Sequence, residues 1–387
     1  MIKKLSVKNF RSLRDVTIDL RRRNVLVGPN MSGKSNLIDV LRFLNRIVFA
    51  QPGQTGLPTA VRSFGGFSEL AWKGEDPGVL QIAVEGDDPV IGPMGGWNYT
   101  LRLVSDRNEF VRISNETLTI QTTSGTRELI KEGPNGTRIL CNQDDRTFSQ
   151  IGSQDRSALE FEIPDWEGNR LREFISSWRF YNLIPPMMKT SNQTAAVPYL
   201  TEHGENLSSW LLTIQTRYSE SFAQITRVMK DLFPEIESLF ASPSQQATVL
   251  VASKERFLRR PVSADFMSDG ELVFLALVSL LFCPRELGSD LYCIEEPENH
   301  LHPRLLDVLV ELQRQIPIED SAQTFTTTHS PYYVDKCDLD DIIVVERRNG
   351  ATSCIRPSDR PHLRQLLQSH EIGLGDLFYS GALSSAT

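Results

Sequence analysis

The chain has 387 residues, a length that suggests two or three structural units and excludes a small domain dependent on disulfide bonds. Hydrophobic residues make up 40% and charged residues 23%, which excludes a wholly disordered, collagen-like or coiled-coil-only chain. The 41 Lys and Arg residues against 49 Asp and Glu residues give a net charge of −8. Any contact with a nucleic acid would therefore need a local basic patch, because the overall field repels a polyanion.

The cysteines and the apolar stretches indicate the cellular compartment that suits the chain. The five cysteines lie far apart without a C-x-x-C pair, so the sequence favours neither a zinc ribbon nor a disulfide framework and suits a reducing cytoplasm. The first ten residues alternate polar and apolar side chains and show no secretion signal. The most apolar stretch, 272–283, has about 12 residues against the roughly 20 that span a bilayer. No membrane contact is expected.

The first predicted elements are short strands. Residues 2–8 and 16–20 alternate polar and apolar side chains, and 24–28 is an apolar run that ends in glycine. From Lys34 onward apolar residues recur at helical spacing. A strand, a glycine loop and a helix therefore follow one another, which is the context that a phosphate-binding loop needs.

The middle of the chain predicts a different kind of unit. Residues 99–104, 109–113 and 117–121 alternate and indicate an antiparallel sheet. Polar, glycine-containing segments run through 122–157 without a clear strand pattern. Residues 206–233 carry apolar side chains at intervals of three, four and seven, which predicts a helix that is interrupted or bent.

The last third returns to alternating strands and helices. Residues 248–252 resume strand character, 271–282 form an apolar helix, and 291–294 is a short buried strand. A further strand is predicted at 323–328.

The run Gly28-Pro-Asn-Met-Ser-Gly-Lys-Ser35 matches the pattern G-x-x-x-x-G-K-[ST]. In this motif the backbone N–H groups and the following helix N-terminus cradle phosphates. Lys34 is predicted to contact the β and γ phosphates of ATP, and Ser35 to bind Mg²⁺. The predicted nucleotide-binding residues of this loop are Gly28, Asn30, Ser32, Gly33, Lys34, Ser35 and Asn36.

Two carboxylates and a histidine follow the later strands. Glu295 and Glu296 end the strand at 291–294, where the first can hold Mg²⁺ and the second can orient or deprotonate an attacking water. His329 ends the strand at 323–328, where it can reach a γ-phosphate from the side opposite the lysine. Glu296 and His329 are the predicted catalytic residues.

The run Ser268-Asp-Gly-Glu271 stands just before the apolar helix. In isolation it is simply a helix cap, because a serine followed three residues later by a glutamate forms a capping box. Placed in order before Glu295, it also predicts an anion site built from the Ser268 hydroxyl, the Gly270 N–H group and the helix N-terminus.

The order of these four motifs resembles the ABC-type ATPase heads shared by RecF, SMC proteins and the OLD nucleases. The resemblance is closest to the stand-alone AAA family ATPases related to OLD and RecF, on the opening Leu5-Ser-Val-Lys-Asn-Phe-Arg-Ser12, the run 295–303 and the ending 374–381. It implies an α/β P-loop fold with a mixed central β-sheet flanked by helices, an antiparallel β subdomain and a helical insertion. The implied domains are the N-terminal part of the head with Walker A (1–96), the antiparallel subdomain and helical insertion (97–255), and the C-terminal lobe with signature, Walker B and switch histidine (256–387).

The resemblance also implies a head-to-head homodimer with two ATP molecules between the subunits, in which Ser268 acts on the partner's site. It makes Glu295 and Glu296 the Walker B pair, 299–303 the D-loop segment and His329 the switch histidine. Glu295 stands where the broader superfamily usually has aspartate.

Other family features are absent from the sequence or not placed in it. The stretch between Lys34 and Ser268 includes the head's own sheet and leaves no room for the coiled-coil arms of SMC proteins. Too few residues follow His329 for the TOPRIM nuclease domain of OLD proteins. Gln51 and Gln54 lie near the expected magnesium-sensing glutamine, but neither ends a convincing strand.

The leading functional hypothesis is an ATP-hydrolysing dimeric switch that regulates a separate effector, a nuclease or toxin, in bacterial anti-phage defence. An alternative is a RecF-like clamp on DNA, for which Arg21–Arg23, Arg256 and Arg259–Arg260 would contact phosphates. A third reading is a non-catalytic scaffold whose assembly follows ATP occupancy, and an intact Glu296 argues against it.

Overall fold

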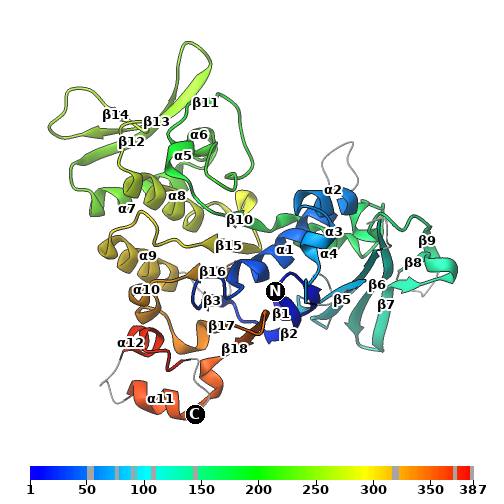
Figure 1. Ribbon diagram of the computed structural model, residues 1–387. Helices are drawn as coiled ribbons and strands as arrows, with labels where there is room; N and C mark the ends of the chain where they lie inside the picture. The colour runs from blue at the N-terminus through cyan, green and yellow to red at the C-terminus, as the bar shows by residue number, and fades with distance from the viewer. Residues whose placement is uncertain are drawn as a thin grey trace.

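The computed structural model describes residues 1–49, 56–74, 78–88, 91, 94–105, 110–142, 147–315, 322–368 and 373–383. Within these residues the strands form three sheets, arranged as shown in Figure 1. No helix in these ranges is long and apolar enough to cross a membrane. The α-helices are α1 (Lys34–Val48), α2 (Gly56–Ser63), α3 (Phe67–Leu70), α4 (Asn169–Ser177), α5 (Pro185–Met188), α6 (Leu207–Arg217), α7 (Ser219–Leu232), α8 (Asp269–Leu281), α9 (Pro303–Gln315), α10 (Pro331–Asp335), α11 (Pro361–Gln368) and α12 (Leu374–Tyr379).

A mixed six-stranded sheet carries the nucleotide-binding motifs. In spatial order its strands are β10 (Arg179–Tyr181), β15 (Leu291–Glu295), β16 (Gln323–Thr328), β3 (Arg23–Val27), β17 (Ile342–Arg348) and β18 (Ala351–Ile355). Neighbouring strands are parallel except β17 and β18. Glu295 pairs with Thr327, and Thr328 pairs with Val27. The carboxyl ends of three neighbouring strands therefore meet at one edge, where ligands bind in open α/β sheets.

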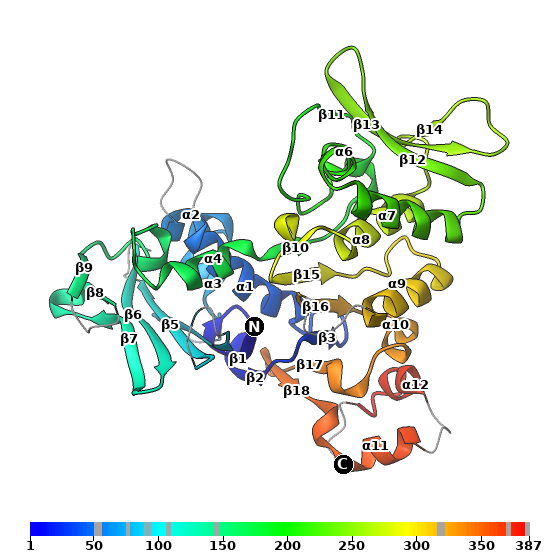
Figure 2. The same ribbon diagram turned by 180° about the vertical axis from the view of Figure 1, so that it is seen from behind.

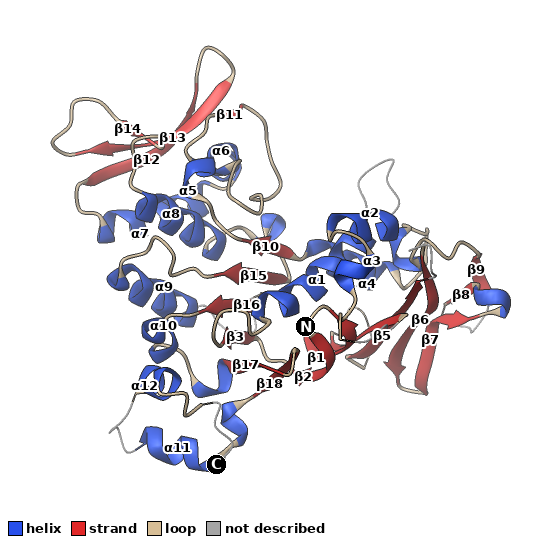
Figure 3. Ribbon diagram, viewed as in Figure 1, coloured by secondary structure: helices blue, strands red, loops and turns tan. Residues whose placement is uncertain are grey.

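The two faces of this sheet pack into different cores because side chains alternate along a strand. Leu26 of β3 and Ile343 of β17 lie in the core that includes α1. Val25, Val27 and Val344 lie in a second core with α8, α9 and α10. Figures 2 and 3 show α1 on one side of the central strands and α8, α9 and α10 on the other. The flanked mixed sheet confirms the predicted fold class.

An eight-stranded antiparallel sheet forms a second lobe, at the right of Figure 1. In spatial order its strands are β2 (Leu13–Asp19), β1 (Ile2–Phe10), β4 (Val79–Asp87), β5 (Gly96–Ser105), β6 (Val111–Thr122), β7 (Gly125–Glu132), β8 (Arg138–Cys141) and β9 (Thr147–Ile151). The segments 109–113 and 117–121 were expected to be separate strands, but residues 111–113 and 117–121 belong to one strand, β6. The polar stretch 122–157 also contains β7 to β9, whose mostly polar residues hide the two-residue period.

A third lobe lies between β10 and α8 and contains α5, α6, α7 and a small antiparallel sheet, at the top left of Figure 1. Its strands are β11 (Asn192–Gln193), β12 (Ile236–Pro243), β13 (Thr248–Glu255) and β14 (Val262–Ser263). The predicted interrupted helix is confirmed, because α6 ends and α7 begins around Tyr218, whose φ of −136° and ψ of 59° are not helical.

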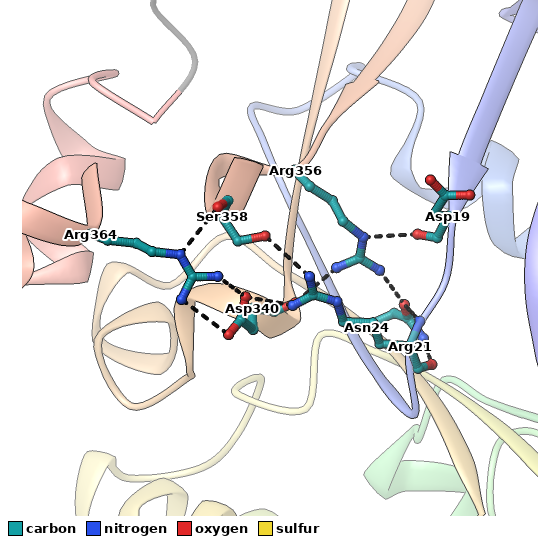
Figure 4. Close-up of polar contacts among 7 residues, drawn as sticks. All are labelled: Asp19, Arg21, Asn24, Asp340, Arg356, Ser358 and Arg364. Carbon is teal, nitrogen blue, oxygen red and sulfur yellow. Dashed lines mark hydrogen bonds and ion pairs between the residues drawn. The ribbon is translucent and has the colours of Figure 1, made fainter. Parts of the chain in front are cut away.

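A cluster of polar side chains fastens the last strands to the first ones (Figure 4). Arg356 donates hydrogen bonds to the carbonyl oxygens of Asp19 and Asp340 and to Oδ1 of Asn24, over 2.8 to 2.9 Å. Arg21 forms an ion pair with Asp340 at 2.6 Å. Burial, with a contribution from Arg21, lowers the pKa of Arg356 to about 10. The cluster holds the end of β18 against the start of β3.

Candidate nucleotide-binding site

The loop 28–35 joins β3 to α1, and its shape requires glycine at two positions. A Cβ atom on Gly28 would lie 2.1 Å from the Val345 carbonyl oxygen. Gly33 has a φ of 107°, and a Cβ atom there would lie 2.2 Å from Thr352 Oγ1. Because Gly33 is the N-cap residue of α1, the free N–H groups of the first helical turn border the loop. This geometry is suited to an anion.

Two side chains from outside the motif hold the loop in place. The hydroxyls of Ser12 and Thr352 lie 2.7 Å apart, and Thr352 donates to the carbonyl oxygen of Ser32 at 2.8 Å. Asn36 donates to Ser12 Oγ at 2.6 Å. Sequence reasoning missed both residues as loop supports. Ser12 belongs to the opening run 5–12, whereas Thr352 has no local signal because it lies on β18, far along the chain.

The residues of the loop fit a phosphate chain. The Ser32 hydroxyl is buried and has no hydrogen-bond partner among the described residues. An unsatisfied buried hydroxyl costs about 1–3 kcal/mol, which a ligand oxygen would recover. Ser35 is exposed at the first turn of α1. An orphan hydroxyl, two required glycines and a helix N-terminus therefore lie within one loop.

Lys34, His329 and Glu296 form a continuous chain of contacts between three strand ends. The Lys34 ammonium group donates to the carbonyl oxygens of Gly28 at 2.7 Å and Pro29 at 3.1 Å, and lies 3.3 Å from His329 Nδ1. His329 Nε2 lies 2.7 Å from Glu296 Oε1. An ammonium group has no acceptor, so Nδ1 accepts from Lys34 and Nε2–H donates to Glu296. Burial lowers the pKa of Lys34 to about 8, opposed by Glu296 and Glu298.

Glu296 adopts a left-handed backbone conformation, with a φ of 46°. Its N–H donates to the Thr327 carbonyl oxygen at 2.9 Å, and its Oε2 accepts from Asn299 at 2.9 Å. A glutamate in this conformation costs on the order of 1–3 kcal/mol, and such residues cluster at functional sites. The turn places the Glu296 carboxylate beside the end of β16.

Glu298 holds the backbone that carries His329. Its Oε1 accepts from the Thr328 hydroxyl at 2.6 Å and from the His329 N–H at 2.9 Å. Its Oε2 is buried without a hydrogen-bond partner in the described part of the chain. Sequence reasoning missed this role, although Glu298 stands in the run 295–303.

Glu295 ends β15, and its Oε1 accepts from Arg42 Nη2 at 2.8 Å. Burial lowers the pKa of Arg42, but Glu202, Glu295 and Asp39 together raise it by more, so its pKa lies above the ordinary value. The Ser35 hydroxyl and the Glu295 carboxylate are hard oxygen donors, the ligands that Mg²⁺ prefers.

Ser268 and Gly270 are not brought to this cluster. Ser268 is the N-cap residue of α8, and it forms a capping box with Glu271. The neighbouring Asp269 contacts Lys189 at 2.7 Å, and Lys189 lowers the pKa of Asp269. No hydrogen bond or ion pair between described residues joins Ser268 or Gly270 to the loop 28–35. Figure 1 shows α8 across the central strands from α1.

The two glutamines near the expected magnesium-sensing position cannot be compared with the fold. Gln51 and Gln54 lie outside the described residues. Strand β10 lies beside β15, so its end at Tyr181 brings Asn182 to the same sheet edge as Glu295. The Asn182 N–H donates to the Glu202 carbonyl oxygen at 2.9 Å. Three residues are too few for a recognisable strand pattern, which is why the sequence did not indicate β10.

Comparison with known proteins identifies the family of the chain. Residues 23–335 match the family described as "AAA domain, putative AbiEii toxin, Type IV TA system". An OLD nuclease from Thermus scotoductus is 23% identical over 394 residues, which cover 96% of this chain and 68% of that protein.

Solved structures show the same fold at lower identity. An Smc head bound to the C-winged helix domain of ScpA is 15% identical, with a TM-score of 0.58 over 92% of this chain and 97% of that one. A second Smc head with an extended coiled coil, bound to the C-terminal domain of ScpA derived from Pyrococcus furiosus, is 14% identical, with a TM-score of 0.55 over 96% and 99%. Since the family match spans most of the chain, the chain belongs to that AAA-domain family, as an ABC-type P-loop ATPase of the OLD and RecF-like group.

Proposed function

We propose that the chain binds ATP with Mg²⁺ and hydrolyses ATP as a dimeric switch that regulates a separate effector protein. In this proposal the loop 28–36 holds the phosphates, and Ser35 and Glu295 hold Mg²⁺. Glu296 orients and deprotonates the attacking water, and His329 stabilises the γ-phosphate. Mg²⁺, when bound, neutralises charge that develops on the phosphate oxygens.

The observation that supports hydrolysis most directly is the contact chain from Lys34 through His329 to Glu296. It places an ammonium group, an imidazole and a carboxylate at one sheet edge, with 3.3 Å between Lys34 and His329 and 2.7 Å between His329 and Glu296. A general base must lie within hydrogen-bond reach of the group that it serves, and the contact between His329 and Glu296 keeps this carboxylate at the site. A scaffold that only binds ATP does not require a carboxylate held in this position.

The position of Ser268 supports a dimer. Its hydroxyl is exposed at the N-terminus of α8, apart from the loop of its own chain. A helix N-terminus favours an anion, so a second subunit could present its bound phosphates there. Each active site would then be built from two chains.

Several findings support a partner effector. The description of the matching family names a toxin and a toxin–antitoxin system, and the sequence relative is a nuclease. Both Smc heads are bound to a domain of another protein. A role in anti-phage defence belongs to this proposal.

The test is ATP hydrolysis by wild type, Glu296→Gln, Ser268→Arg and an equimolar mixture of the two variants. Each variant alone should be nearly inactive. Random pairing makes half of the dimers mixed, each with one site free of both changes, so the mixture should regain about one quarter of the wild-type rate. A mixture as inactive as its components would contradict the shared site, and ATP binding by wild type without turnover would favour the scaffold.

A DNA clamp is the second candidate, because of one loop. Residues 256–261, between β13 and β14, are all exposed and include Arg256, Arg259 and Arg260. Phe257 beside them is 83% exposed, and basic residues interleaved with aromatic ones suit a nucleic acid strand. Binding of duplex DNA that weakens steeply with salt and stimulates hydrolysis several-fold would favour the clamp.

A further inference from the structure

Arg42 lies at the centre of a charge cluster that links three parts of the chain. It stands on α1, about two turns beyond the phosphate-binding loop, and only 12% of its side chain is exposed. Its Nη2 donates to Glu295 at 2.8 Å and lies 2.9 Å from Glu202 Oε1, and its Nη1 donates to Asp39. It is the side chain that hydrogen-bonds Glu295 within the described part of the chain.

The surroundings hold the Arg42 guanidinium in one place. Asp39 is itself paired with Arg11, which anchors the Nη1 side of the fork. The guanidinium lies over the ring of Phe180, 5.1 Å from its centroid. A planar fork fixed by packing and by an ion pair loses little further entropy when it binds a carboxylate.

We infer that Arg42 is a positioning residue that fixes one oxygen of Glu295, so that the other remains for the metal ion. This inference rests on the proposed function. A glutamate has one more rotatable bond than the aspartate usual at this position, so its carboxylate needs a partner to hold it in one orientation. The hydrogen bond uses Oε1, so Oε2 is left for Mg²⁺. Arg42 thereby explains how glutamate serves at this position.

The hydrogen bond from Arg42 also bears on metal affinity. Arg42, Arg11 and Arg46 carry three positive charges near the three negative charges on Asp39, Glu202 and Glu295, so the cluster is close to neutral before a cation binds. A hydrogen-bond partner of a metal-binding carboxylate changes metal affinity about 10- to 100-fold when it is removed.

The experiment compares the Mg²⁺ dependence of nucleotide binding in wild type, Arg42→Met and Arg42→Lys. A fluorescent ATP analogue is titrated at a series of MgCl₂ concentrations and in EDTA, so the readout is equilibrium binding rather than turnover. Arg42→Met should raise the half-saturating Mg²⁺ concentration about 10- to 100-fold and leave binding in EDTA within about twofold. Arg42→Lys, which keeps the charge without the fork, should lie between Arg42→Met and wild type.

The matched control is Arg127→Met. Arg127 is buried to a similar degree, with 14% of its side chain exposed, and pairs with Glu167 in the antiparallel lobe. Its Mg²⁺ dependence should equal that of wild type. If Arg42→Met does not fold, Arg42→Met combined with Glu202→Gln removes one of the uncompensated charges and serves in its place.

A double-mutant cycle with Glu295 separates a positioning role of Arg42 from a general loss of charge. In a Glu295→Asp background the shorter side chain no longer reaches Arg42, so Arg42→Met should change the Mg²⁺ dependence less than twofold. An equal effect in both backgrounds, or an unchanged Mg²⁺ dependence in Arg42→Met, would overturn the positioning role alone. Wild-type binding that ignores Mg²⁺ would overturn the proposed function instead.

Discussion

Replacement of Glu298 by alanine tests whether the position of His329 depends on a residue outside the catalytic pair. The Glu298 carboxylate accepts from the Thr328 hydroxyl and from the His329 N–H. Thr328 is fully buried, so alanine would leave its hydroxyl without that acceptor. Hydrogen bonds to charged groups contribute about 1.5–3 kcal/mol each, and partial replacement by water leaves about 2–4 kcal/mol for the pair.

A loss of about 2 kcal/mol lowers the population of the ordered loop roughly 30-fold relative to the loosened one. If hydrolysis needs His329 in place, the kcat of Glu298→Ala should fall at least tenfold. Hydrogen exchange of the segment 326–331, followed by mass spectrometry, should become faster while the exchange of α1 is unchanged.

Glu298→Gln is the control, because its amide oxygen can accept from the same two donors. Its kcat and its exchange at 326–331 should stay near those of wild type. The reasoning is refuted if Glu298→Ala hydrolyses ATP at the wild-type rate while His329→Ala is inactive, or if Gln and Ala at position 298 behave alike.

Three further changes have defined outcomes. Gly33→Ala places a Cβ atom against Thr352 in a backbone conformation that disfavours it, so nucleotide binding should fall more than tenfold by equilibrium titration, and retained affinity would contradict the fit. Burial and Asp338 raise the pKa of Asp341 to about 6, so its contribution to stability is present at low pH and lost as pH rises from about 4 to about 6. The free energy of unfolding of Asp341→Asn, measured with denaturant, should therefore rise by about 1–2 kcal/mol relative to wild type between pH 4.5 and pH 7. This range is reduced from the full pKa shift because the carboxyl is partly exposed. Parallel pH curves for the two proteins would refute this. Phe274→Ala leaves a cavity in the core between α8 and the central sheet and should cost about 3–5 kcal/mol in the same assay, whereas a loss below about 1 kcal/mol would show that the core collapses.

The motifs were predictable because each is local in the chain. The phosphate-binding loop needs only a strand, two glycines and a helix in succession, and all of these lie between Arg23 and Val48. Glu295 ends a five-residue strand that is largely apolar, and Glu296 follows it. His329 follows a six-residue strand rich in threonine, a residue that favours strands. Parallel packing of such strands then brings their carboxyl ends together.

The supports of the site were not predictable, because each comes from a distant part of the chain. Thr352 reaches the loop through β18, and Glu202 reaches Arg42 through the segment after β10. The strands β7 to β9 were missed because β8 and β9 have only four and five residues and β7 buries two adjacent residues, so none shows a clear two-residue period.

By itself the sequence indicated the phosphate-binding loop and the residues proposed to carry the chemistry, because these stand in short-range motifs. The resemblance of those motifs to a known family implied the fold class. The tertiary structure decided which distant side chains orient these residues. Arg42 meets Glu295, and Glu298 meets the backbone of His329, only after β15 and β16 have paired beside α1. It also decided that Ser268 lies apart from its own loop, because α8 packs on the opposite face of the central sheet from α1.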